Sequence, residues 1–156
     1  MRIALYQPDI PQNTGTIVRL AACLDVPVEI IGPAGFDASD RGFRRAGLDY
    51  IKQGQIIRHV SFAAFEKDLE LNNRRLILLS SAAEKAYTRF EFSPSDCLLF
   101  GRESAGVPDE IHGKADVRLT IPMVAGLRSL NLAVSVAMVV GEALRQIDGF
   151  PAGNVE

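Results

Sequence analysis

Short apolar runs alternate with longer segments of mixed polarity along this chain of 156 residues. Apolar runs of four or five residues, bounded by polar or turn-forming residues, are typical of buried β-strands. Strands that alternate with helices along a chain form a mostly parallel sheet with helices on both faces. The pattern therefore predicts an α/β fold, with strands over residues 3–6, 28–31, 56–60, 76–79, 97–100 and 117–121.

Two segments repeat apolar residues at the three- and four-residue spacing of a helix that packs on one side. The first follows Thr14 and Gly15, where we expect the helix to begin. The second follows Ser61, whose hydroxyl predicts a cap, and it ends at Asn72-Asn73. The apolar positions are Ile17, Leu20, Ala21 and Leu24 in the first helix, and Phe62, Phe65 and Leu69 in the second.

The C-terminal helix, predicted between Leu130 and Ile147, carries apolar residues on nearly all sides. Almost no polar face interrupts them before Glu142. A small domain does not easily surround its terminal helix, so we favour a homodimer in which this helix is buried against a second copy. The alternative interpretation is a helix wedged centrally into its own sheet.

The composition agrees with one domain over residues 1–156. Hydrophobic residues make up 47% and charged residues 23% of the chain, which is typical of a globular protein with its own core. The formal net charge of -2 gives no overall attraction to nucleic acid, so any RNA contact must be local. No apolar run reaches membrane-spanning length, and the N-terminus turns polar at Gln7, so we expect neither a signal peptide nor membrane contact.

The two cysteines lie in apolar runs and lack the C-x-x-C spacing of a redox or metal motif. We therefore predict that Cys23 and Cys97 are reduced thiols in the core, as expected for a cytoplasmic protein. The segment from Gly149 to Glu156 is predicted to be a loose tail.

Three separated segments place Gly, Pro or Asn where an apolar run ends, and each predicts a loop that presents backbone groups to a ligand. They read Pro-Gln-Asn-Thr-Gly-Thr-Ile-Val-Arg over residues 11–19, Phe-Gly-Arg-Glu-Ser-Ala-Gly-Val-Pro over 100–108, and Ile-Pro-Met at 121–123 leading to Arg-Ser-Leu-Asn-Leu at 128–132. Their order and content resemble the three motifs of the SPOUT class of RNA methyltransferases. The closest resemblance is to the small, single-domain tRNA 2′-O-methyltransferases that act on the wobble nucleotide.

The resemblance implies transfer of a methyl group from S-adenosyl-L-methionine to a ribose 2′-hydroxyl of tRNA, without a metal. It also implies a homodimer with sites at the subunit interface, and a C-terminal segment tucked through a loop as a trefoil knot. The periodicity of the chain shows no knot, and general topology rules make knots very rare. The knot is therefore expected from the family alone.

A cofactor pocket can be built largely from backbone groups, because peptide N–H and C=O groups match the edge of adenine. Strand-end loops that converge at one edge of a parallel sheet supply such groups. Gly101 and Gly106 would allow close approach of the backbone, whereas Leu130 and Leu132 would cover the base. The predicted cofactor-binding residues are Leu79, Phe100, Gly101, Glu103, Gly106, Ile121, Met123, Leu130 and Leu132. The alternative is that each glycine only makes a turn.

The resemblance implies catalytic roles for Arg19, Asn13 and Asn131, with Arg19 near the target ribose. A guanidinium keeps its proton, so we expect Arg19 to orient the hydroxyl and stabilise the developing alkoxide rather than act as a base. Ser129 is predicted to cap the last helix. Glu103 either fixes its loop by accepting backbone hydrogen bonds or contacts the substrate.

A basic stretch between residues 41 and 59 contains five basic side chains and one acid, in a chain that is negative overall. We predict that Arg41, Arg44 and Arg45 bind RNA phosphates of the anticodon arm and that Tyr50 stacks on a base. The alternative is a solvated helix face whose arginines pair with nearby aspartates.

Two departures from the wobble-enzyme motifs leave the target nucleotide open. The second motif reads Gly-Arg-Glu-Ser at 101–104 and the third reads Leu-Asn-Leu-Ala-Val at 130–134, and the Gly-Arg-Glu form is more like the wider group that modifies rRNA or other tRNA positions. Residues 43–50 resemble the wobble enzymes, and we expect no RNA-binding extension before Ile3, which favours tRNA.

The alternatives to methyl transfer from other classes of function are a serine hydrolase and a non-catalytic binding module. A serine hydrolase is disfavoured because position 102 is Arg where the nucleophile elbow needs its first glycine. A non-catalytic nucleotide- or RNA-binding module stays open, although no G-x-G-x-x-G follows the first strand.

Overall fold

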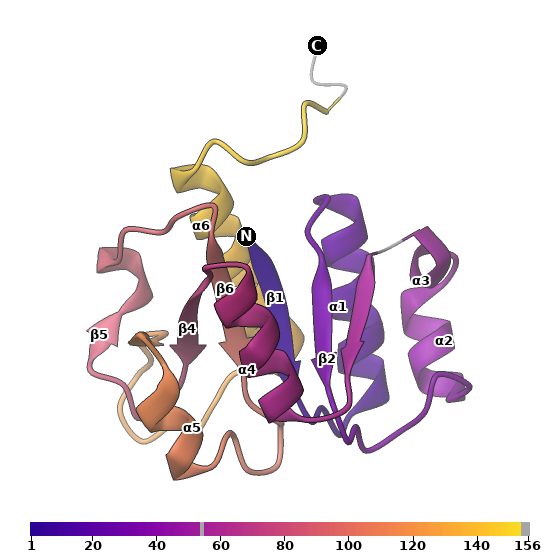
Figure 1. Cartoon of the computed structure of the whole chain (residues 1–156), viewed down its shortest axis with the longest axis horizontal. Coiled ribbons are helices and arrows are strands. Elements are labelled where there is room, and N and C mark those ends of the chain that lie inside the picture. The colour runs from indigo at the N-terminus through magenta and orange to yellow at the C-terminus, as the bar shows by residue number, and fades with distance from the viewer. Residues whose placement is uncertain (54, 154–156) are drawn as a thin grey trace.

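The structure is a computed structural model that describes residues 1–53 and 55–153. Its strands are β1 Arg2–Tyr6, β2 Val28–Ile31, β3 Ile56–His59, β4 Arg75–Leu79, β5 Lys85–Ala86, β6 Asp96–Phe100 and β7 Val117–Thr120. They form one sheet in the order β3-β2-β1-β6-β4-β7-β5, in which every pairing is parallel (Figure 1). The predicted parallel sheet is confirmed.

All six predicted strands are present, and no strand end differs from the prediction by more than one residue. β3 ends at His59, one residue before the predicted end, and Val60 beyond it is 87% exposed. β7 similarly ends at Thr120 rather than at residue 121. The sequence pattern missed β5, because two residues on the edge of a sheet are too few to show a period.

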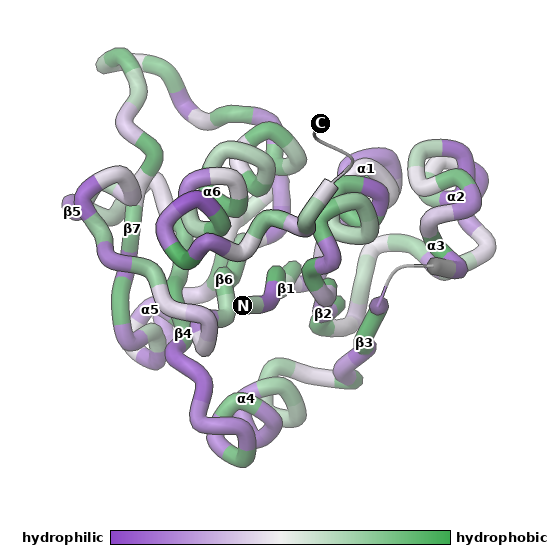
Figure 2. The backbone as a smooth tube through the Cα atoms, turned by 90° about the horizontal axis from the view of Figure 1, so that it is seen from above, coloured by the Kyte–Doolittle hydropathy of each residue, from purple (hydrophilic) through white to green (hydrophobic). Residues whose placement is uncertain are grey.

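The helices are α1 Pro11–Cys23, α2 Arg41–Gly47, α3 Tyr50–Gln53, α4 Phe62–Leu71, α5 Asp109–Lys114 and α6 Leu132–Gln146. Side chains of a strand alternate between the two faces of its sheet. On β1, Ile3 and Leu5 join the core beneath α1 and α6, whereas Ala4 and Tyr6 join the core beneath α4 and α5. Figure 2, which looks along the sheet, shows α1 and α6 on one side and α4 on the other. Helices therefore cover both faces, as predicted.

α1 begins at Pro11 and not at Thr14-Gly15, so the predicted start is wrong. Proline suits the first turn of a helix because its missing N–H would have no partner there. Gly15 lies buried inside α1, where a Cβ would be 2.5 Å from the backbone oxygen of Phe43. The glycine thus lets α2 pack directly on α1 rather than starting the helix. α4 follows Ser61 as predicted, and the Ser61 hydroxyl accepts a 3.2 Å hydrogen bond from Ala64 N.

Asn131, and not Ser129, caps α6. Its Oδ1 accepts hydrogen bonds of 2.8 Å from Ala133 N and 3.3 Å from Val134 N. One side of α6 packs on the sheet of its own chain through Val136, Val139, Val140, Ala143 and Leu144. The other side leaves Val134 48% and Met138 40% exposed. The helix is therefore wedged against its own sheet and also presents an uncovered apolar face.

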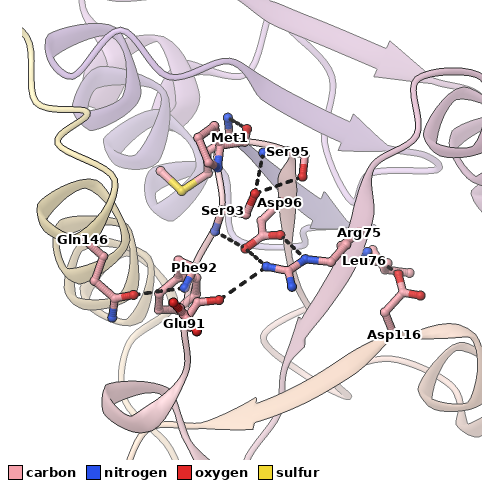
Figure 3. Close-up of polar contacts among 11 residues, drawn as sticks. Met1, Arg75, Leu76, Glu91, Phe92, Ser93, Ser95, Asp96, Asp116 and Gln146 are labelled. Atoms are coloured by element: carbon pink, nitrogen blue, oxygen red, sulfur yellow. Dashed lines mark hydrogen bonds and ion pairs between the residues drawn. The ribbon is translucent and has the colours of Figure 1, made fainter.

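Figure 3 shows how the far end of α6 is fastened to the sheet. Gln146 Oε1 accepts a 2.9 Å hydrogen bond from Phe92 N. Four residues after Phe92, the buried Asp96 at the start of β6 accepts 2.7 Å and 2.8 Å hydrogen bonds from Arg75 Nε and Ser93 N. A fully buried carboxylate needs such partners. These contacts hold the amino end of the sheet and leave the carboxyl end to form the site.

The two cysteines are free, but only one of them lies in the core. Cys97 is buried in β6, and burial raises the pKa of its thiol. Cys23 is exposed at the end of α1, so its predicted burial is wrong. Among the described residues, no helix combines the length and apolar character needed to cross a membrane.

Candidate functional site

A cavity of about 480 Å³ lies at the carboxyl ends of β4, β6 and β7. Loops that follow parallel strands meet at the same edge of a sheet, where α/β proteins usually bind ligands. The walls are Leu79 to Ser81 after β4, Phe100 to Val107 after β6, Thr120, Ile121 and Met123 after β7, and Ser129 to Leu132 before α6; Ile10, Asn13, His112 and Ser135 complete the lining. The strand-end loops that were predicted to converge are thus brought together, and within the Ile-Pro-Met segment Pro122 does not line the cavity.

All nine predicted cofactor-binding residues line this cavity. So do Asn13 and Asn131, which were predicted to be catalytic. Lining a cavity does not test binding or catalysis, and those roles stay predictions. The volume lies within the range of roughly 300–1,000 Å³ of small-molecule sites.

The loop after β6 is closed on itself. Arg102 N donates a 3.1 Å hydrogen bond to Gly106 O, and Gly106 N donates a 2.8 Å bond back to Arg102 O. Gly106 has a φ of 66°, which favours glycine, and a Cβ on Gly101 would lie 2.6 Å from the Gly106 backbone. Both glycines therefore shape the turn, and the close contact that Gly101 makes is with the backbone of Gly106. Approach to a ligand remains a separate prediction.

A chain of hydrogen bonds connects the three motifs. Asn131 Nδ2 donates to Asn13 Oδ1 at 2.9 Å, and Asn13 Nδ2 donates to Glu103 Oε1 at 3.0 Å. Glu103 Oε2 accepts a further 3.0 Å bond from Asp9 N. Glu103 thus accepts a hydrogen bond from a backbone N–H of the loop before α1 rather than of its own loop. The three loops are positioned as one unit.

Two carboxyl groups meet at this junction. Asp9 Oδ2 accepts a hydrogen bond from Ser104 Oγ and a 3.3 Å bond from Arg102 Nε. Its hydrogen bonding with Glu103, Ser104 and Arg102 holds the pKa of Asp9 well below its usual range. Burial, followed by the neighbouring Asp9 carboxyl, raises the pKa of Glu103. Of the two carboxyl groups, Asp9 therefore holds its negative charge more firmly, and Glu103 takes up a proton more readily than Asp9 does.

Arg19 does not line the cavity of its own chain. It follows Asn13 by six residues on α1, which places it about 9 Å farther along the helix and about 120° around it. The side chain is exposed, and its guanidinium carbon lies 5.5 Å from the centre of the Tyr50 ring. One face of Tyr50, which was predicted to stack on a base, is thus covered by Arg19.

The predicted RNA-binding arginines Arg41, Arg44 and Arg45 are exposed on α2. Within residues 1–53 and 55–153, none of the three forms an ion pair. The nearby acids have other partners: Asp40 caps α2 by accepting from Gly42 N and Phe43 N, and Asp37 accepts from Ser39. The alternative of arginines paired with these aspartates is not what the structure shows.

A group of metal-type ligands lies outside the cavity. Side-chain atoms of Glu29, His59 and Asp68 lie within 4.8 Å of one another, but none of these residues lines the cavity. Arg2 Nη1 donates a 2.7 Å hydrogen bond to Glu29 and lies 3.7 Å from Asp68. The guanidinium therefore already supplies positive charge to these carboxylates.

The sequence of residues 1–141 matches the family described as "SpoU rRNA Methylase family". The chain belongs to the SpoU family. The predicted relationship to SPOUT-class RNA methyltransferases is thereby confirmed at the level of the family.

Two known proteins are similar to this chain over most of its length. A protein of Beijerinckia indica named "tRNA (cytidine(34)-2'-O)-methyltransferase" is 59% identical over 93% of this chain and 91% of its own length. A solved structure described as "Structural insights into the 2-OH methylation of C/U34 on tRNA" is 42% identical, with a TM-score of 0.90 over 95% of this chain and 96% of that one.

A second solved structure contains the cofactor. It is an AdoMet-bound rRNA methyltransferase from Sinorhizobium meliloti, 26% identical with a TM-score of 0.85. The similarity covers 92% of this chain and 55% of that one. AdoMet is S-adenosyl-L-methionine, so this fold binds that cofactor in a related protein.

His112 on α5 also lines the cavity, although it was not among the predicted site residues. A signal was present, because only Val107 and Pro108 separate the Gly106 turn from α5. Such a short connection keeps the helix beside the loop that precedes it.

Proposed function

We propose that this SpoU-family protein transfers the methyl group of S-adenosyl-L-methionine to the ribose 2′-hydroxyl of the wobble nucleotide of tRNA, cytidine or uridine 34. The observation that carries the proposal is the cavity in which Asn13, Glu103 and Asn131 join the three motif loops by hydrogen bonds. The 59% identity to a tRNA (cytidine(34)-2'-O)-methyltransferase supports the choice of substrate. A tRNA substrate also agrees with a cytoplasmic location.

The cavity fits the cofactor in both size and chemistry. Backbone groups of the loops after β4, β6 and β7 would bind adenosine, and the half-exposed Leu130 and Leu132 would cover the base. When bound, the cofactor supplies an electrophilic methyl group. The loops Phe100–Val107 and Ser129–Leu132 would hold it in one orientation and exclude water from one side.

Arg19 is assigned to the ribose. Its guanidinium would donate hydrogen bonds to the 2′-oxygen and stabilise negative charge as the O–H bond breaks. Because guanidinium keeps its own proton, the proton leaves to solvent or to an RNA phosphate oxygen. Asn13 and Asn131 would hold the loops around the reacting groups.

A homodimer would bring Arg19 to a cavity. Val134 and Met138 form the exposed apolar face of α6, and Leu130, which is also exposed, lines the cavity just before this helix begins. A second copy packed on this face would cover it and lie next to the cavity. Since Arg19 lies outside its own cavity, it would act at the cavity of the partner. The trefoil knot around the C-terminal segment is part of the same proposal.

Arg41, Arg44 and Arg45 would bind the anticodon arm. The three arginines are exposed, lack carboxylate partners within the described residues and project from α2, which packs on α1. The helix that carries Asn13 and Arg19 is therefore in direct contact with the proposed RNA-binding helix.

The first experiment is calorimetry with purified protein, followed by a methylation assay. We expect S-adenosylmethionine and S-adenosylhomocysteine to bind and NAD to give no heat. Incubation with unmodified tRNA should place one methyl group on the ribose of nucleotide 34, with none on rRNA transcripts. Folded protein that binds neither adenosyl ligand would overturn the proposal. Cofactor binding without transfer to any RNA would indicate a binding module, and transfer to rRNA would indicate the alternative substrate.

A further inference from the structure

The exposed Arg19 has an aromatic partner and no acidic one. Its guanidinium carbon is 5.5 Å from the centre of the Tyr50 ring, within the distance of a cation–π contact. Across residues 1–53 and 55–153, Arg19 forms no ion pair. The ring of Tyr50 is thus the contact that restricts this side chain.

An exposed arginine has many rotamers, and holding one of them costs conformational entropy. A group that must meet a reacting oxygen works best when it is held in place before the substrate arrives. A carboxylate would hold Arg19 but would also neutralise its charge. An aromatic face holds a cation without adding a negative charge.

The backbone around Tyr50 is closely packed against α2 and α1. It is half-buried at the start of α3, and the next residue, Ile51, packs so closely on Gly47 that a Cβ there would lie 2.5 Å from Ile51 Cγ1. The same Gly47 backbone packs against Gly15 of α1. Two glycine contacts therefore fix α3 relative to the helix that carries Arg19.

We propose that Tyr50 is a positioning residue that orients the Arg19 guanidinium for methyl transfer. This inference rests on the proposed function, in which Arg19 acts on the target ribose. It competes with the prediction that Tyr50 stacks on a base, because a base on the covered face of the ring would displace Arg19.

The test compares Tyr50→Leu with the matched variant Tyr50→Phe, which keeps the ring and loses only the hydroxyl. At saturating tRNA, we expect Tyr50→Leu to lower kcat by about five- to tenfold. KM for tRNA and the cofactor Kd should stay within about twofold, because neither binding step uses the ring. Tyr50→Phe should stay within about twofold of the wild type in all three quantities.

A second measurement does not depend on activity. In ¹⁵N-labelled protein, the Nε–H resonance of Arg19, assigned by its loss in Arg19→Ala, should be displaced by the ring in the wild type and in Tyr50→Phe. In Tyr50→Leu it should move to the position of a free arginine. An unmoved resonance would overturn the contact itself.

The outcomes separate two kinds of failure. An inactive wild type, or a fully active Arg19→Ala variant, would overturn the proposed function and this inference with it. An active wild type, an inactive Arg19→Ala and an unaffected Tyr50→Leu would overturn only the positioning role. A rise in KM for tRNA with unchanged kcat in Tyr50→Leu would also overturn it and would restore base stacking.

Discussion

Asn131 Nδ2 donates a 2.9 Å hydrogen bond to Asn13 Oδ1, across 118 positions of sequence. The same Asn131 caps α6 through its Oδ1, so one side chain both starts a helix and connects two motifs. The two functions use different atoms of the amide and can therefore be separated by substitution.

Replacing Asn131 by Ala should remove both functions, and replacing it by Asp should remove only the connection. Aspartate keeps the oxygen that caps the helix but has no N–H to donate. We expect Asn131→Ala to lower the free energy of unfolding by about 1 kcal/mol and Asn131→Asp to leave it nearly unchanged. Both variants should lose turnover, since the hydrogen bond between Asn131 and Asn13 is lost. Denaturant unfolding and methylation assays measure the two effects.

The control is Ser129→Ala, which tests the cap that the sequence predicted. Ser129 does not cap α6, so the free energy of unfolding of the Ser129→Ala variant should match that of the wild type. A loss as large as that of Asn131→Ala would contradict the assignment of the cap.

The raised pKa of Glu103 should depend on Asp9. Burial raises this pKa first and the Asp9 carboxyl adds to it, so Asp9→Asn should lower it part of the way toward the ordinary 4.5. Carboxyl ¹³C titration by NMR measures the shift. The control is Asp37→Asn, which removes a carboxylate that lies outside this junction and should leave the pKa of Glu103 unchanged. An equal Glu103 pKa in wild type and Asp9→Asn would refute the coupling.

The two carboxyl groups act on stability in opposite directions. Asp9 has a lowered pKa, so its contribution is present above its unfolded value of 3.8 and is lost as the pH falls through its lower folded pKa. Glu103 has a raised pKa, so its contribution is present below its unfolded value of 4.5 and is lost as the pH rises through its higher folded pKa. Asp9→Asn should therefore reduce the gain in stability between strongly acid pH and pH 4, measured by denaturant unfolding.

The exposed face of α6 should hold a dimer together. Val134→Glu or Met138→Glu places a charge on this face, and we expect a folded monomer with little activity. Val136 and Val140 on the same helix are fully buried in their own core, so a charge at either position should unfold the chain instead. Sedimentation and circular dichroism distinguish these outcomes. Lys67→Glu, on the exposed side of α4, is the control, and a dimer in all variants would exclude this face.

Removing Arg44 and Arg45 together should weaken tRNA binding and reduce its dependence on salt. The slope of log K against log salt should fall in magnitude by about 0.7 to 0.9 for each lost phosphate contact. Cofactor affinity should not change, because neither residue lines the cavity. The matched control Lys67→Ala with Arg89→Ala removes the same charge from other exposed positions. Equal effects of the two double variants would mean that only net charge matters.

Apart from β5, the sequence alone determined the strands, the parallel sheet and the loops that make the cavity. These features follow from local rules: a buried strand such as β6 is a short apolar run, and Ser61 caps α4 through a backbone N–H three residues away. The carboxyl ends of parallel strands must meet at one edge, so the sequence already places Leu79, Phe100 and Ile121 together.

Tertiary structure decided which residue caps a helix, where a helix begins and which side of it is buried, because local pattern allowed more than one answer to each. Ser129 and Asn131 are both good caps, and only Asn131 also finds Asn13 as a partner. Gly15 is typical of a helix boundary, but contact with Phe43 O places it inside α1. Val134 and Val136 are the same residue type on one helix, and only the packing of α6 decides which is buried. Local periods fix what a segment can become, whereas contacts between distant segments determine which of its atoms find partners.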